Sequence, residues 1–168
     1  MMPYSVIEDF GIGKKDSSMN RMVFVGAVSL FLAACSRREP LVVRQFTLRE
    51  IDPNWTEDLM IRGEIQKRLY GAVEWEEREK RKGQYYSVRW RANPANGEVK
   101  IRFQYQQGST GSRVHELVQR VAPDGGTGVV EFAITGDVYA KGGPVTAWRM
   151  ELSQGGLVLG EEKSFLWE

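Results

Sequence analysis

The 168-residue sequence contains only one cysteine and one histidine. A single cysteine excludes a disulfide within the chain, because a disulfide joins two sulfur atoms. Cys35 and His115 are also too few for zinc sites, which need several Cys or His ligands. No segment matches the glycine-rich phosphate loop that ends in Gly-Lys. The sequence therefore predicts neither a metal ion nor a nucleotide cofactor.

The sequence also has no excess of charge of either sign, because 23 Lys and Arg residues balance 22 Asp and Glu residues. Proteins that bind nucleic acid electrostatically usually carry a strongly basic face. The formal net charge of +1 argues against that kind of partner. Hydrophobic residues make up 42% of the chain and charged residues 27%, a balance that suits a packed core. The length suits one domain plus a targeting segment.

One short hydrophobic run is present, from Met22 to Ala34, and it carries no charge. A helix that spans a bilayer takes roughly 20 apolar residues, whereas the core of a signal peptide takes about 7–15. Arg21 supplies a positive charge before the run, and small residues lead from it to Cys35. The pattern therefore indicates a signal peptide over residues 19–34.

The segment Leu32-Ala33-Ala34-Cys35 closely resembles the lipobox of bacterial lipoproteins. That resemblance implies cleavage between Ala34 and Cys35, with a diacylglyceryl group and acyl chains such as palmitate on the cysteine. One acyl chain holds a membrane only marginally, at about 0.8 kcal/mol per buried methylene, whereas several chains anchor a protein durably. Cys35 is then an anchor point and not a nucleophile. The alternative is an uncleaved anchor helix in which Cys35 is a buried small residue.

The first 18 residues are an unusual start for a signal peptide, since they carry three acidic residues and two lysines. Met19 would make a better start, so residues 1–18 are expected to be a disordered upstream extension. Ser36 follows the cysteine, and a Ser there resembles the class of lipoproteins sorted to the outer membrane. The expected location is therefore a bacterial membrane, with the outer membrane favoured and the inner membrane as the alternative.

The clearest strand pattern lies in two neighbouring segments. Tyr86, Val88 and Trp90 alternate with polar side chains, and Val99 to Tyr105 repeat the alternation after the turn Asn93-Pro94-Ala95-Asn96-Gly97. A period of two indicates a strand with one buried and one solvated face. In the first expected strand, Val42, Phe46 and Leu48 can share one face. In the sixth, Trp148, Met150 and Leu152 can face inward.

After a polar tether at 35–40, residues 41–168 predict a mainly β domain. About seven regularly spaced strands, with no helix between the last six, are typical of an antiparallel β-sandwich. The pattern resembles immunoglobulin-like and fibronectin type III-like domains, a likeness of architecture that implies no activity. The strands are expected over 41–51, from 84, from 99, over 112–121, over 129–135, after 144 and over 157–167.

The mature chain also resembles an uncharacterised family of small bacterial lipoproteins. The likeness implies no activity, because the family has no assigned function. The resembling segments are Arg62-Gly63-Glu64, Leu69-Tyr70-Gly71, Gly83-Gln84-Tyr85-Tyr86 and Val145-Thr146-Ala147-Trp148-Arg149.

The stretch 54–83 does not fit the strand pattern. Glu74 to Lys82 places acidic residues before basic ones, which complements a helix dipole, and Gly83 suits a C-terminal cap. A short helix is expected over about 73–82, between the first and second strands. The stretch could present a partner surface, but a flap that covers an open sheet edge is favoured. Further upstream, Ile65, Leu69 and Val73 recur at helical spacing. Gly63 and Gly71 interrupt this stretch and disfavour a helix.

Residues with catalytic chemistry are few and scattered. His115 falls in the middle of an expected strand with no evident nucleophile beside it, so a packed or surface role is favoured. The carboxylates between Glu74 and Glu79 could serve glycoside hydrolysis, yet solvated ion pairs with the neighbouring bases explain them more simply. Asp124 and Asp137 lack the dense acidic series of a calcium loop. The sequence predicts a protein that is not an enzyme.

Aromatic residues supply the only candidate ligand surface. Trp90 and Trp148 fall on apolar strand faces and are expected in the core, whereas Trp55, Trp75 and Tyr85 are less constrained and could stack on sugar rings. The predicted function is a non-enzymatic, membrane-anchored module of the cell envelope whose partner is an envelope protein or a glycan. A carbohydrate-binding or cell-wall-binding domain is the alternative, and a hydrolase ranks third.

Intact mass spectrometry of the protein extracted from membranes tests the N-terminal assignment. The expected mass is that of a chain beginning at Cys35 plus a diacylglyceryl group and an amino-terminal acyl chain. A mass that still includes Ala34, with an unmodified thiol, would contradict both cleavage and lipidation.

Overall fold

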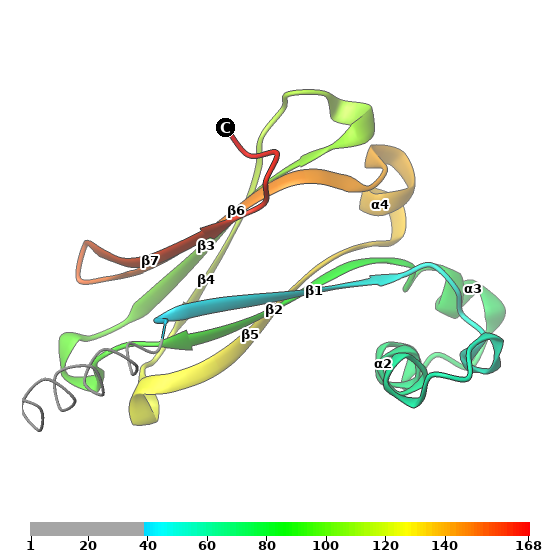
Figure 1. Ribbon diagram of the computed structural model, residues 1–168, viewed down its shortest axis with the longest axis horizontal. Coiled ribbons are helices and arrows are strands. Elements are labelled where there is room, and N and C mark those ends of the chain that lie inside the picture. The colour runs from blue at the N-terminus through cyan, green and yellow to red at the C-terminus, as the bar shows by residue number, and fades with distance from the viewer. Residues whose placement is uncertain (1–38) are drawn as a thin grey trace, which may run out of the picture. The chain divides into compact units, whose positions relative to one another are not determined.

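The computed structural model describes residues 39–168, and the expected upstream extension, signal helix and lipobox lie outside the described residues. Seven strands form two antiparallel sheets (Figure 1), which confirms the mainly β sandwich fold. The strands are β1 (Leu41–Leu48), β2 (Gly83–Arg91), β3 (Val99–Gln107), β4 (His115–Val121), β5 (Thr127–Thr135), β6 (Val145–Gln154) and β7 (Leu157–Lys163).

The strand order is β1-β2-β5 in one sheet and β4-β3-β6-β7 in the other. In an immunoglobulin constant domain the fourth strand joins the sheet of the first, second and fifth strands. Here β4 pairs with β3 instead, with Phe103 opposite Leu117 and Tyr105 opposite His115. The sandwich is therefore immunoglobulin-like with its fourth strand in the other sheet.

The core lies between the two sheets and comes from alternate residues of their central strands. Tyr86 and Phe103, from opposite sheets, have ring centroids 4.7 Å apart, and Phe132 lies 5.3 Å from Phe103. Trp90, Met150 and Leu152 are buried, as the alternation predicts, and the partly buried Trp148 packs against the core. Apolar burial of this kind is the main favourable contribution to folding, at about 25 cal/mol per Å².

A helix between β5 and β6 corrects the expectation that no helix separates the last six strands. Helix α4 (Gly136–Gly142) is short and has glycine at both ends, so its sequence carries little helical signal. The buried Gln107 amide at the end of β3 donates hydrogen bonds to the carbonyl oxygens of Val138 at 3.1 Å and Gly143 at 2.8 Å. Tertiary contacts therefore hold a helix that propensity does not predict.

Two helices, rather than one, lie between β1 and β2. The unexpected one is α2 (Leu59–Leu69), whose first turn is capped by Asp58, because the Asp58 carboxylate accepts from the N–H groups of Met60 and Ile61. Gly63 lies on the exposed side of this helix, where no packing surface is lost. Burial of the opposite side offsets the glycine's helix cost.

The expected helix over 73–82 is present in shorter form as α3 (Trp75–Glu79). Its first turn has a capping box between Glu74 and Glu77, as the acidic start predicts. The expected cap at Gly83 is wrong, because the helix ends at Glu79 with Lys80 as its C-cap, and Gly83 is the first residue of β2. Gly83 has a φ of 149° and its Cα packs closely against the β5 backbone, which leaves no room for a side chain.

Replacing Tyr86 with phenylalanine tests the core through its pH dependence. Burial raises the pKa of the Tyr86 hydroxyl well above its ordinary value, and the nearby Tyr139 hydroxyl adds to that rise. Above about pH 10 the unfolded state loses this proton while the folded state keeps it, so the free energy of unfolding falls by up to about 1.36 kcal/mol per pH unit. Y86F should flatten that decline.

Chemical denaturation at a series of pH values from neutral to strongly alkaline measures this effect. Y70F is the matched control, because Tyr70 is exposed and should leave the alkaline slope unchanged. An identical slope in Y86F and the wild-type protein would contradict the assignment.

Candidate functional site

A second apolar cluster lies outside the sandwich, on the outer face of the β1-β2-β5 sheet. Side chains alternate along β1, so Leu41 and Val43 enter the main core while Phe46 and Leu48 face the opposite side. Helix α2 covers this outer face near the end of β1 (Figure 1). The cluster consists of Leu48, Ile51, Ile65, Leu69 and Tyr85, with Phe46 packed against it.

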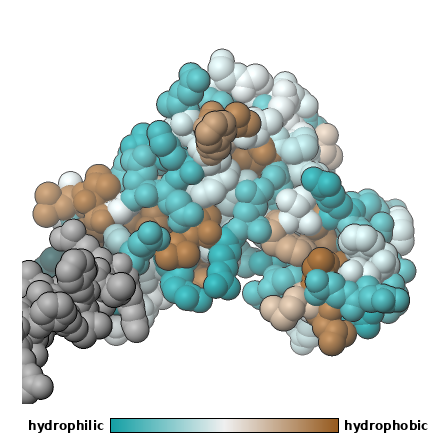
Figure 2. Space-filling view, viewed as in Figure 1, coloured by the Kyte–Doolittle hydropathy of each residue, from teal (hydrophilic) through white to brown (hydrophobic). Residues whose placement is uncertain are grey.

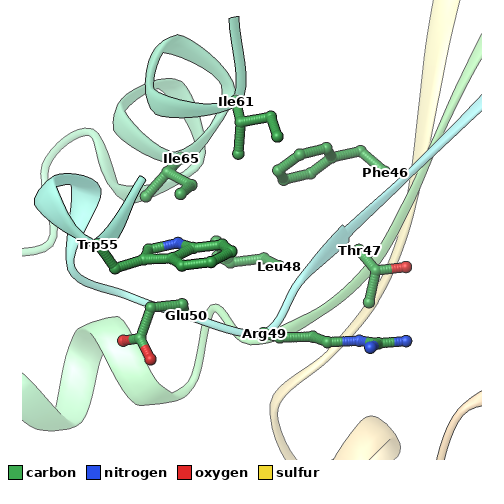
Figure 3. A pocket seen from close by; sticks show the side chains of 8 residues that line it. All are labelled: Phe46, Thr47, Leu48, Arg49, Glu50, Trp55, Ile61 and Ile65. Atoms are coloured by element: carbon green, nitrogen blue, oxygen red, sulfur yellow. The ribbon is translucent and has the colours of Figure 1, made fainter. Parts of the chain in front are cut away.

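The cover is incomplete and leaves an open pocket with a volume of about 540 Å³. Volumes of this order are typical of ligand sites. Ile61 and Phe46 face each other across the pocket, and the Trp55 indole lies beneath Ile65 (Figure 3). The lining comes from the end of β1, the following turn and α2, namely Phe46, Thr47, Leu48, Arg49, Glu50, Trp55, Ile61 and Ile65. The pocket is mainly apolar, with its charged groups at the rim.

The segment that carries Trp55 is fixed by hydrogen bonds between side chains and backbone. The Asp52 carboxylate accepts from the N–H of Asn54 at 2.9 Å, which holds the turn before the indole. After the turn, Arg62 reaches back from α2 and donates to the carbonyl oxygen of Thr56 at 2.8 Å. The indole therefore has a defined place in the pocket wall although Trp55 is 59% exposed.

Arg68 joins α2 to the sheet. Its side chain is only 6% exposed and forms an ion pair with Glu131 of β5, with a second contact to Glu64 at 3.5 Å. The guanidinium lies over the Tyr85 ring, 4.3 Å from the centroid, a cation–π geometry. This contact fixes the position of α2, and hence of the Ile61 and Ile65 side chains in the pocket.

Tyr85 is a packing residue, which corrects its assignment as a ligand-facing aromatic. Its ring is buried in the outer cluster, and its hydroxyl donates to the carbonyl oxygen of Arg81 at 2.6 Å. Burial raises the pKa of the Tyr85 hydroxyl, with Arg68 and Arg81 acting in the opposite direction. Alternation predicts a solvated face for β2, but α2 covers the part of that face at Tyr85.

The other predicted site residues are not brought together. Trp75 is 67% exposed on α3 and does not line the pocket, so only Trp55 of the three candidate aromatics belongs to it. Cys35 and the cleavage position after Ala34 lie outside the described residues. Ile61 is a pocket residue that the strand pattern does not indicate, although Asp58 as an N-cap is a signal for the helix that carries it.

The side chains considered for catalysis, His115 and the carboxylates of α3, take part in packing and helix capping. The His115 ring stacks on Tyr105, with centroids 5.2 Å apart. The Glu77 carboxylate accepts from the N–H of Val73 at 2.9 Å and so helps to cap α3. Within residues 39–168, no group of three His, Cys, Asp or Glu side chains could hold a metal ion. No helix in that part of the chain is long and apolar enough to span a membrane.

Comparisons with known proteins add no assignment. No family model, curated protein or solved structure matches this chain. The function is therefore inferred from the residues themselves.

Replacing Arg68 with methionine should loosen α2 while keeping most of the side chain's apolar contacts. Loss of the ion pair and the cation–π contact should cost about 1–2 kcal/mol of local stability, which speeds amide exchange in α2 about tenfold. Hydrogen exchange followed by mass spectrometry measures this. K67M is the matched control, because Lys67 is exposed on the same helix. Unchanged protection of α2 in R68M would show that this contact does not hold the helix.

Proposed function

We propose that this chain is a bacterial lipoprotein that holds a non-enzymatic β-sandwich interaction module on a membrane of the cell envelope. The observation that carries the proposal is the position of the only cysteine. Cys35 ends an uncharged apolar run that is too short to cross a bilayer comfortably, and small residues precede it. The outer membrane is the favoured location because Ser36 follows the cysteine.

The start of the domain supports a role close to the bilayer. Only residues 36–40 separate Cys35 from the first residue of β1, so lipid on that cysteine would hold the sandwich near the membrane. The pocket lining begins at Phe46 of β1, five residues after Leu41 and about 17 Å along the strand at 3.3–3.4 Å per residue. An anchored domain of this kind would present the pocket at the end of β1 that is distant from the tether.

Exposed apolar side chains near the pocket support an interaction role. Contiguous apolar surface on a folded protein commonly marks a site of binding. Figure 2 shows apolar groups, interspersed with hydrophilic ones, on the lobe that contains α2. The exposed apolar residues on the turn and helix that line the pocket are Trp55, Leu59, Met60 and Ile61. The stretch between β1 and β2 thus does more than cover the sheet.

A glycan-binding role is the second candidate function. The exposed Trp55 indole at the wall of an open pocket favours it, since an indole face can stack on a sugar ring. The burial of Tyr85 and the separate position of Trp75 weaken it, because they remove a multi-aromatic platform. The interaction-module proposal therefore ranks first.

Replacing Cys35 with serine tests the anchor. Cells labelled with palmitate should incorporate label into the wild-type protein and none into C35S, because the hydroxyl does not replace the thiol as the lipid acceptor. Any processed C35S protein should leave the membrane fraction. S36A is the matched control and should stay labelled and membrane-bound. Label in C35S, or processed and unlabelled C35S that remains in membranes, would refute the proposal.

A further inference from the structure

The second half of β1, from Gln45 to Leu48, is an open sheet edge. β1 is the terminal strand of its sheet, and its pairing with β2 places Pro40 opposite Arg91, whose N–H donates to the Pro40 carbonyl oxygen at 2.8 Å. Antiparallel ladders alternate, so the even-numbered residues of β1 bond to β2. The backbone groups of Val43, Gln45 and Thr47 therefore point away from the sheet.

Only the first half of the β1 edge, around Val43, is closed. The outward N–H of Val43 donates to the Glu162 carboxylate of β7 at 2.7 Å, which blocks pairing there. No hydrogen bond from the described part of the chain reaches the outward N–H groups of Gln45 and Thr47. An exposed row of strand N–H and C=O groups is the chemistry that recognises another extended backbone.

The apolar pocket lies at this same edge. Its lining includes Phe46 and Leu48 from one face of β1, Thr47 from the other, and Arg49 directly after the strand. Successive side chains of a strand point to opposite sides, so a pocket lined by both sets extends from the outer face of the sheet to the strand's edge. Figure 3 shows these side chains on either side of the strand. Open backbone groups and an apolar pocket are therefore adjacent.

Two arginines without an ion-pair partner among the described residues flank the edge. Arg44 and Arg49 are exposed, and neither pairs with a carboxylate among residues 39–168. The nearby Glu50 carboxylate already accepts from the N–H groups of Ile51 and Asp52, at 2.8 and 3.2 Å. An acidic segment complements this edge. A second copy of β1 would supply Arg44 and Arg49 rather than carboxylates, so it complements this edge less well.

We propose that an extended acidic segment of a partner polypeptide adds to β1 as a further strand of the β1-β2-β5 sheet. Its backbone bonds to Gln45 and Thr47, and one bulky apolar side chain enters the pocket beneath α2. Backbone bonds supply affinity in this mode of recognition, while the pocket supplies specificity. The inference deepens the proposed interaction role, on which it rests, by naming the partner's chemistry.

Selection from a displayed library of short random peptides tests the proposal, with the full chain held in detergent as bait. Enriched peptides should share a bulky apolar residue flanked by Asp or Glu. T47P should weaken the best of them at least tenfold, because proline removes an outward donor and blocks the edge while β1 keeps its bonds to β2. W55A should also weaken binding, by about tenfold through loss of the pocket wall. W75A is the matched control and should bind like wild type.

Three results would overturn the proposal: selected peptides without an acidic and apolar consensus, equal binding by W55A and W75A, or binding by folded T47P at the wild-type level. Self-association of the chain that T47P abolishes would also overturn it, by showing that a second copy occupies the edge. If T47P does not fold, the comparison of W55A with W75A decides. Because binding is measured in detergent and C35S should bind equally, a failure here is distinct from a failure of lipidation.

Discussion

β1 is apolar on both of its faces, and this constraint decides how the rest of the molecule is arranged. Leu41 and Val43 require the second sheet of the sandwich as cover, while Phe46 and Leu48 require cover on the opposite side. A two-layer sandwich supplies only the first. The chain between β1 and β2 supplies the second through α2, which explains why a domain of this architecture carries a helical insertion at that connection.

The way α2 is attached explains why its cover leaves a pocket. The helix is joined to the sheet at its C-terminal end, where Arg68 contacts Glu131 and Tyr85 and where Leu69 is buried. Its N-terminal end instead contacts the segment that carries Trp55, through the hydrogen bond from Arg62 to the carbonyl oxygen of Thr56. Side chains near that end, such as Ile61, therefore line an opening rather than fill a core.

Period-two alternation was enough to predict the sandwich, because β2 and β3 each place every second side chain in the core. It could not predict α2, since Gly63 lowers helix propensity and only tertiary packing compensates. It also places Tyr85 on a solvated face, whereas α2 packs over that part of the strand and buries the ring. The pocket was beyond sequence reasoning for a related reason. Trp55 was a candidate, but its neighbours come from segments whose meeting depends on the path of the insertion.

The two halves of β1 differ in a way that relates the proposed anchor to the proposed binding surface. Near Leu41 the strand edge is closed by Glu162, and Gly160 of β7 lets Pro40 approach closely. A closed edge at this end suits the part of the domain that would lie nearest the lipid. From Gln45 onward no hydrogen bond from residues 39–168 closes the edge, and the insertion adds an apolar pocket there. Natural edge strands are usually blocked along their length, so an edge blocked only beside the tether is the pattern expected if the open half is kept for a partner.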